Sequence, residues 1–440
     1  MTLRPCTVFF ATLILGARFS AAQTITDFPI PTASSGAVSI TAGPDGNLWF
    51  TELAGNRIGR ITPAGVVTEF PLPAAGSAPS SITRGSDGNL WFTENGGNRI
   101  GRITPAGAIS EFPIPSAFPA GGPSEITAGP DGALWFTETD GGTGGRVRRV
   151  TTAGQFSVFG PPHPSQSPHQ IVSGPDGALW FSMPLSGRVG RATTAGTIAE
   201  FPIPTPGTDA LALATGPESS VWIAEVLPTG SRLGRIAADG SIAEIPIPSI
   251  TSAVFGMTAG PDAALWLTEH DASRVARVTT SGTVTEFPLP AGSEPWGITA
   301  GPDGALWFVE RAANRIGRIT PGPIGPCVPD ARAMCLSGAR FRLTAAWTTT
   351  TASGNGAAVP LTDDSGYFWF FSAGNIEMVV KTLNACGFNS RFWVFAGGLT
   401  NVDVTLTVTD MHTGAVKAYR NPQGTPFQPI QDTSAFATCR

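Results

Sequence analysis

Two histidines and a set of glutamates are the side chains of this sequence best suited to chemistry. His169 and His270 could act as general bases, because an imidazole exchanges a proton near neutral pH. Glutamates end a recurring Leu-Trp-Phe-Thr-Glu segment, and their carboxylates could take part in chemistry at a shared site. They are Glu52, Glu94, Glu138, Glu225, Glu269 and Glu310. A single loop histidine more often only forms hydrogen bonds, so both histidines are candidates and neither is assigned.

A sevenfold repeat must position these residues. Its anchor tryptophans lie 41 to 45 residues apart, and a fixed period of this size is typical of radial or solenoid arrays. They are Trp49, Trp91, Trp135, Trp180, Trp222, Trp266 and Trp307. Each copy contains four short apolar stretches with turns at Gly-Pro-Asp-Gly and Thr-Pro-Ala-Gly, which predicts one four-stranded propeller blade. We therefore predict an all-β fold with a seven-bladed β-propeller over residues 23–321.

The fourth stretch of the repeat predicts how the ring closes. Its first copy contains Asp27 and Phe28, before the first tryptophan, and no copy follows Trp307. The N-terminal segment can therefore supply the outer strand that the last blade lacks, which leaves no blade edge unpaired. We predict that residues 24–28 pair with residues 315–320.

The mouth of the central channel is the expected ligand site. Strand direction alternates within a blade, so the loop before the first strand and the end of the second strand lie at the same face. Loops converge there while the blades hold them in place. The loops bring Val38, Ser80, Ser124, His169, Leu211, Phe255 and Trp296 to this mouth. The repeat glutamates are expected beside them, but two arginines in each third strand make ion pairs between blades the simpler interpretation.

The two ends of the chain lie outside the repeat. Residues 1–22 contain an apolar run after Arg4 and then small residues, typical of a secretory signal peptide and too short to span a membrane. A Pro/Gly linker at 322–326 leads to residues 327–440, which predict a small β-sandwich-like domain. Its cysteines are Cys327, Cys335, Cys386 and Cys439. Four cysteines in an exported domain predict two disulfides, and the pairing stays open.

Charge and composition limit the partners. The net charge is −5 and the sequence has no basic patch, so a nucleic acid is not an expected partner. We expect an exported protein without a membrane span, monomeric, whose partner is a small-molecule or peptide ligand at the propeller mouth.

The repeat segments GPDGALWFTE, NRIGRIT and TEFPLP resemble the blades of the virginiamycin B lyase (streptogramin B lyase) family, over about residues 23–321. This resemblance implies a seven-bladed propeller closed by its N-terminal strand. It also implies ring opening of cyclic depsipeptide antibiotics by elimination, with Mg²⁺ at the mouth and Glu294 and Glu310 as its ligands. The C-terminal part, around GYFWFF and RFWVFAGGLTNVDVTLTVTD, resembles a recurrent module of exported bacterial proteins.

The sequence departs from the family pattern at the residues that would do the chemistry. The family's base histidine corresponds to Trp296, a second mouth histidine to Phe255, and a tyrosine to Val38. An indole or a phenyl ring cannot accept the proton that elimination removes. Three functions therefore remain open: a lyase-like binding protein, an enzyme (a diverged Mg²⁺-dependent lyase or a metal-dependent hydrolase) with His169 or His270 as base, and a surface interaction scaffold.

Overall fold

The computed structural model describes most of the chain beyond the N-terminus. The described residues are 25–115, 121–140, 144–159, 168–184, 186–217, 220–227, 231–321, 327, 329–349, 352–411 and 416–436. The predicted signal peptide, the linker at 322–326 and Cys439 lie outside them.

The described part of residues 25–319 forms seven four-stranded antiparallel sheets, each named below by its first strand. The β2 sheet contains β2 (Ala37–Ala42), β3 (Leu48–Glu52), β4 (Arg57–Ile61) and β5 (Val67–Pro71). The β6 sheet contains β6 (Pro79–Arg84), β7 (Leu90–Glu94), β8 (Arg99–Ile103) and β9 (Ile109–Pro113). The β10 sheet contains β10 (Gly122–Ala128), β11 (Leu134–Thr139), β12 (Gly145–Val150) and β13 (Phe156–Phe159).

The remaining four sheets follow the same order. The β14 sheet contains β14 (Ile171–Ser173), β15 (Leu179–Met183), β16 (Arg188–Ala192) and β17 (Ile198–Pro202). The β18 sheet contains β18 (Asp209–Gly216), β19 (Ser220–Val226), β20 (Ser231–Ile236) and β21 (Ile242–Ile247). The β22 sheet contains β22 (Val254–Ala259), β23 (Leu265–Glu269), β24 (Arg274–Val278) and β25 (Val284–Pro288). The β26 sheet contains β26 (Pro295–Ala300), β27 (Leu306–Glu310), β28 (Arg315–Ile319) and β1 (Ile25–Pro29).

The first strands of the sheets follow one another around a ring. Each contacts the first strand of the next sheet, from β2 through β6, β10, β14, β18 and β22 to β26, and β26 contacts β2. Every described sheet runs outward from that strand in chain order, except that the β26 sheet takes its outer strand from the N-terminus. This arrangement is that of a β-propeller, whose ring form protects sheet edges.

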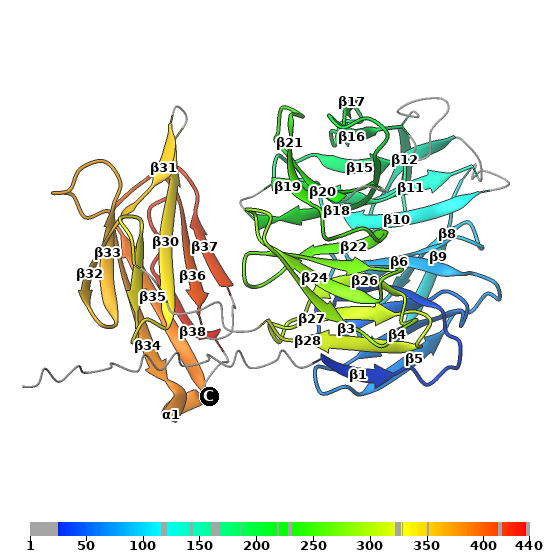
Figure 1. Ribbon diagram of the computed structural model, residues 1–440, viewed down its shortest axis with the longest axis horizontal. Helices are drawn as coiled ribbons and strands as arrows, with labels where there is room; N and C mark the ends of the chain where they lie inside the picture. The colour runs from blue at the N-terminus through cyan, green and yellow to red at the C-terminus, as the bar shows by residue number, and fades with distance from the viewer. Residues whose placement is uncertain are drawn as a thin grey trace, which may run out of the picture.

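The predicted closure of the ring is confirmed. β1 pairs antiparallel with β28, from Ile25 opposite Ile319 to Pro29 opposite Arg315. Figure 1 shows β1 beside β28, so the first and last strands of the ring share one sheet. Phe28 stacks on Trp307 with ring centroids 5.5 Å apart, as Phe70 of β5 stacks on Trp49 at 5.4 Å. The N-terminal segment thus supplies both the strand and the aromatic ring that most of the other copies provide for themselves; the β18 sheet has Ile245 in place of the ring.

The repeat tryptophans hold the sheets together. All seven are essentially fully buried, which removes a large apolar surface from water in every sheet. In most sheets the indole Nε1 donates to the aspartate of the Gly-Pro-Asp-Gly turn, for example Trp49 to Asp45 at 3.0 Å. The turn aspartate therefore also satisfies a buried donor, a contact that its predicted role in the turn did not include.

The repeat glutamates are placed differently from the prediction. Their side chains are buried, and the ion pairs they form lie within a sheet and not between blades. Glu94 bonds Arg99 at 3.0 Å and Glu310 bonds Arg315 at 2.9 Å, because each pair is directly opposite across adjacent strands. These glutamates are part of the sheet interior and do not line the channel mouth.

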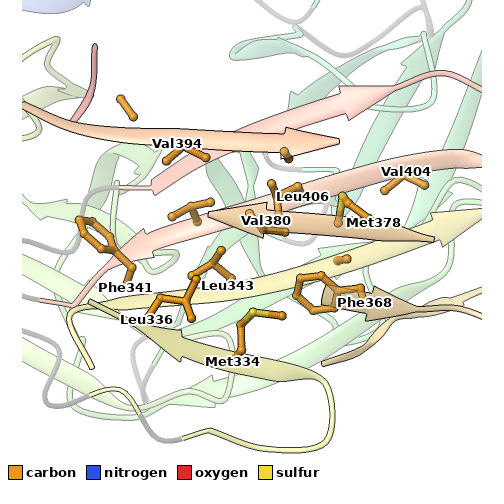
Figure 2. Packing of buried hydrophobic residues seen from close by; sticks show 14 of the residues in the cluster. Met334, Leu336, Phe341, Leu343, Phe368, Met378, Val380, Val394, Val404 and Leu406 are labelled. Carbon is orange, nitrogen blue, oxygen red and sulfur yellow. The ribbon is translucent and has the colours of Figure 1, made fainter. Parts of the chain in front are cut away.

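The C-terminal part is a two-sheet structure (Figure 1). One sheet contains β29 (Ala333–Leu336), β30 (Phe341–Thr348), β36 (Asp403–Asp410) and β37 (Val416–Asn421), with β31 (Ser353–Asn355) beside β30. The other contains β32 (Ala357–Thr362), β33 (Ser365–Trp369), β34 (Met378–Ala385), β35 (Arg391–Gly398) and β38 (Ile430–Phe436). Alternating residues face a shared core, in which Figure 2 shows Phe341, Leu343, Phe368, Val380 and Leu406.

Disulfides occur in this part of the chain, as expected. Cys327 and Cys335 are joined, and Cys386 is also disulfide-bonded. The described helix α1 (Cys386–Asn389) is one turn long, and no helix among the described residues has the length and apolar character to cross a membrane.

Candidate functional site

Six of the seven predicted mouth residues line one pocket of about 220 Å³. They are Val38, Ser80, Ser124, His169, Phe255 and Trp296. They come from the β2, β6, β10, β22 and β26 sheets and from the loop before β14. Leu211, the seventh, lies on β18 and is not among the described residues that line the pocket.

An irregularity in the first strands places these side chains. In β2, β6, β10, β22 and β26 the pairing with the second strand shifts at the mouth residue, for example between Pro295 and Ile298 around Trp296. A β-bulge re-aims the side chain at the bulge, and bulges are common beside functional sites. In these five sheets the irregularity therefore coincides with a residue that lines the shared pocket. The β18 sheet has the same shift around Leu211, which does not line it, so the irregularity alone does not place a side chain in the pocket.

A threonine of the neighbouring sheet fixes each of several mouth residues. Thr51, Thr93, Thr137 and Thr268, each preceding the repeat glutamate, donate to the backbone carbonyl of the mouth residue of the next sheet. The acceptors are Ser80 at 3.1 Å, Ser124 at 2.8 Å, His169 at 2.6 Å and Trp296 at 2.5 Å. This contact was not predicted, although the conspicuous threonine in the repeat could have indicated it.

Gln170 takes over this role where the threonine is missing. The β18 sheet has Ala224 at that position, and the carbonyl of Phe255 in the next sheet instead accepts a hydrogen bond from Gln170 Nε2 at 2.9 Å. The same amide accepts from the backbone N–H of Leu213 at 2.6 Å. Gln170 therefore links three sheets and holds Phe255 in place.

Phe255 and Trp296 form the aromatic wall of the pocket. Their rings are stacked with centroids 4.2 Å apart and an interplanar angle of 10°. The guanidinium of Arg311 lies 4.8 Å from the centroid of Trp296, at a distance suited to cation–π attraction. Both aromatic side chains remain partly exposed and line the pocket, so they offer an apolar surface to a ligand.

His270 stands at the edge of this pair. Its ring is edge-on to Phe255 at 5.0 Å and to Trp296 at 5.2 Å. Its Nδ1 contacts Asp271 Oδ1 at 2.8 Å, and its Nε2 lies 3.8 Å from Glu294 Oε2. The imidazole therefore lies between two carboxylates at the edge of the aromatic pair, and it is not among the described residues that line the pocket.

His169 is the histidine that lines the pocket. Burial lowers the pKa of its imidazole, so the ring is neutral near pH 7. Its backbone is fixed by the bond from Thr137 and by donation to the carbonyl of Ser182 at 2.9 Å. Its Nδ1 is buried without a hydrogen-bond partner among the described residues. A neutral imidazole in this position can donate to or accept from a ligand.

Glu125 is a pocket residue that was not predicted. It follows Ser124 on β10, and its Oε2 accepts a hydrogen bond from the hydroxyl of Ser81 at 2.8 Å. Burial raises the pKa of Glu125 to about 7, although the Ser81 bond acts in the opposite direction. The residue after each mouth position varies along the repeat, so no periodic signal marked this carboxyl group.

Glu294 and Glu310, the predicted Mg²⁺ ligands, differ in their surroundings. The side chain of Glu294 is 46% exposed, whereas that of Glu310 is fully buried and bonded to Arg315. No group of three or more His, Cys, Asp or Glu side chains among the described residues is arranged to hold a metal ion. Arg315 bonds Oε2 of Glu310, and Oε1 has no hydrogen-bond partner among the described residues. With Glu294 exposed and no third ligand grouped with them in the described part of the chain, the two glutamates do not form a ready Mg²⁺ site.

Comparison with known proteins identifies the repeat-containing part. A sequence model of the Virginiamycin B lyase family matches residues 14–227 and 119–324. A streptogramin B lyase structure is 32% identical, with 68% of this chain and 97% of that chain covered at a TM-score of 0.62. The virginiamycin B lyase of Staphylococcus aureus is 34% identical, with 68% and 99% covered at a TM-score of 0.63.

A second structure from Staphylococcus aureus matches equally well. It is a catalytically inactive histidine-to-alanine variant of virginiamycin B lyase with quinupristin, 34% identical over 68% of this chain and 99% of that one, with a TM-score of 0.63. No curated protein matches the chain significantly.

Proposed function

The chain belongs to the virginiamycin B lyase family, and from that membership we propose that its mouth pocket binds a small or cyclic peptide-like ligand without catalysing the family's elimination. The observation that carries this proposal is the stack of Phe255 on Trp296 in the pocket wall. The family resemblance puts histidines at both positions. Their replacement exchanges proton-accepting groups for aromatic surface.

Because Trp296 cannot act as a base, we do not expect elimination to occur through this position. Elimination needs a group that removes the proton next to the carbonyl as the ester oxygen leaves, and the indole nitrogen only donates hydrogen bonds. Mg²⁺ would stabilise the negative charge that develops on the carbonyl oxygen. The surroundings of Glu294 and Glu310 do not fit a ready cation site among the described residues.

The size and lining of the pocket favour a part of a ligand over a whole macrocycle. A volume of about 220 Å³ is small for a drug-sized ligand but sufficient for one aromatic side chain. Phe255 and Trp296 supply apolar contacts, and Ser80, His169 and Gln170 supply polar groups for orientation. We therefore expect one side chain of a cyclic peptide to enter the pocket while the rest stays at the rim.

A second candidate function rests on His169. Its neutral imidazole lines the same pocket and has an unpartnered Nδ1 among the described residues. This supports a diverged lyase or a hydrolase in which His169 removes a proton from the substrate or from water. His270 is less suited, because Asp271 engages one nitrogen and the ring is not among the described residues that line the pocket.

The proposal also covers the number of blades, the domain limits, export and the oligomeric state. We take the seven sheets as the blades of one closed propeller, supported by the β1–β28 pairing and the ring of first strands. We further propose domain limits of 23–321 for the propeller and 327–440 for the C-terminal domain. Export after removal of residues 1–22 and a monomeric state are part of the same proposal. The disulfides support export, because such bonds persist in oxidising compartments.

Equilibrium dialysis against quinupristin tests the binding function. The protein should retain the compound saturably, and Trp296→Ala should weaken retention at least about tenfold, equivalent to about 1.4 kcal/mol. Trp393→Ala, which removes a partly exposed tryptophan from β35 of the C-terminal part, should leave retention unchanged. No saturable retention, or equal losses in both variants, would contradict a binding site at the mouth and favour a scaffold.

A further inference from the structure

We propose that Glu125 is the anionic anchor of the mouth pocket and that the ligand carries a protonated amine beside its apolar part. This assignment rests on the proposed function and specifies the class of ligand. Glu125 is the only carboxylate among the described residues that line the pocket. The aromatic pair and the carboxylate together match an arylalkyl ammonium group, with the ring against Phe255 and the charge toward Glu125.

The carboxylate of Glu125 has one hydrogen-bond donor but no cationic partner among the described residues. Ser81 donates to Oε2 at 2.8 Å. Burial and this hydroxyl account for the shift of the Glu125 pKa, with no contribution from a neighbouring charge. By contrast, Glu94 bonds Arg99, Glu138 bonds Arg148 and Glu310 bonds Arg315. These three repeat glutamates each have an arginine partner, whereas the glutamate in the pocket has none among the described residues.

The charged groups on the surrounding strands are engaged elsewhere. On β6, Arg84 lies at the end opposite the mouth, and Arg99 of β8 pairs with Glu94 of β7. On β11, Glu138 pairs with Arg148 of β12. His169, before β14, is neutral because burial lowers its pKa. The pocket therefore contains a carboxyl group whose charge nothing nearby compensates.

A cationic ligand would remove this imbalance. A partly buried carboxylate without a counter-charge is unfavourable, and burial, by raising the pKa of Glu125 to about 7, brings its neutral and charged forms close in free energy near neutral pH. An ammonium group would restore the charge-assisted hydrogen bond that such a carboxylate lacks. The faces of Phe255 and Trp296 also attract cations, which adds to the preference.

Two probes of the same shape test the inference. 2-Phenylethylamine is cationic from pH 6 to pH 8.5, whereas 2-phenylethanol is neutral, and calorimetric titration gives the dissociation constant of each. At pH 8.5 the amine should bind about tenfold more tightly than the alcohol. Its affinity should fall from pH 8.5 to pH 6 as Glu125 becomes protonated, while that of the alcohol stays constant.

Variants separate the role of the charge from that of the pocket. Glu125→Gln should abolish the preference for the amine and its pH dependence while the alcohol still binds. Ser81→Ala removes the bond that stabilises the charged carboxylate, so the pH dependence should move to higher pH. Glu200→Gln on β17 makes the same substitution at the carboxylate near Arg188 and should change neither.

The outcomes distinguish the inference from the proposed function. Equal binding of amine and alcohol, or an unchanged preference in Glu125→Gln, would overturn the role of Glu125 and leave the pocket as an aromatic binding site. Failure of both probes to bind while quinupristin is retained would also overturn it. Failure of all three compounds would contradict the proposed function itself.

Discussion

The ring of Phe255 lies parallel to that of Trp296, 4.2 Å away, although the two residues belong to neighbouring sheets and are 41 positions apart in the sequence. Their backbones are fixed separately, Trp296 by Thr268 and Phe255 by Gln170. Two independent hydrogen bonds thus maintain one aromatic surface. Where the resemblance implies two imidazoles, this chain has a rigid apolar wall, and the difference changes what the mouth can do.

Removing the threonine beneath Trp296 should weaken binding. In Thr268→Val the shape is kept, but the carbonyl of Trp296 loses its donor, which we expect to cost about 1 kcal/mol of unfolding free energy. Thr51→Val removes the equivalent bond to Ser80 and should cost a similar amount. Only Thr268→Val should also reduce the affinity for quinupristin in equilibrium dialysis. Equal affinities in the two variants would show that the bond does not position the aromatic pair.

Phe28 should stabilise the closed ring. Phe28→Ala removes a partly buried ring from Trp307, and we expect a loss of about 2–3 kcal/mol in urea-induced unfolding. Phe70→Ala breaks the equivalent stack on Trp49 inside the ring and should cost about the same. A loss below about 0.5 kcal/mol for Phe28→Ala alone would mean that the N-terminal segment contributes little to the last sheet.

Glu52 should make stability depend on pH. Both of its carboxylate oxygens are buried without a hydrogen-bond partner among the described residues. Burial, together with the charge of Glu69, raises its pKa to about 8. The folded protein therefore binds a proton that the unfolded chain releases near pH 4.5, so stability is greatest at low pH and falls as pH rises toward 8.

The variant Glu52→Gln tests the direction of this pH dependence of stability. Glu52→Gln resembles the protonated form, so its unfolding free energy at pH 8 should exceed that of the unsubstituted protein by about 1–2 kcal/mol after solvent screening. The two proteins should converge near pH 5. Glu94→Gln removes the negative charge that pairs with Arg99 and should destabilise the protein at both pH values. Urea unfolding at pH 5 and pH 8 checks this, and a stability loss in Glu52→Gln at pH 8 would contradict it.

Export should leave Gln23 as the first residue. Expression of the full chain in a bacterium, followed by N-terminal sequencing of the extracytoplasmic protein, should show cleavage after Ala22, because small residues precede that bond. An uncleaved protein retained in the cytoplasm would contradict the assignment of residues 1–22 as a signal peptide.

The repeat predicted the ring more completely than the rest of the fold. One tryptophan and four apolar stretches per copy are enough to indicate sheets of four strands, and the displaced Phe28 copy indicated the closing strand. In the C-terminal part the sequence predicted the β-sandwich-like class but no repeat marks its individual strands. The exposed faces and polar composition of β31, β32, β37 and β38 dilute the strand pattern there.

The location of the site residues was predicted from the sequence, but their burial and protonation behaviour were not. Loop position alone predicted that His169, Phe255 and Trp296 lie together at the mouth, because alternating strand direction determines which loops share a face. Burial of individual side chains could not be predicted from the sequence. Glu310 is buried in its sheet, and burial raises the pKa of Glu125. The register that opposes Glu310 to Arg315 likewise became evident only from the strand pairing.

Incubation of the protein with quinupristin and Mg²⁺, followed by chromatography and tandem mass spectrometry, tests the central claim most directly. Since Trp296 cannot accept a proton, the cyclic compound should be recovered intact. A linear product one water heavier would indicate hydrolysis and favour His169 as a base. A linear product of unchanged mass would demonstrate elimination and contradict the account of the aromatic wall.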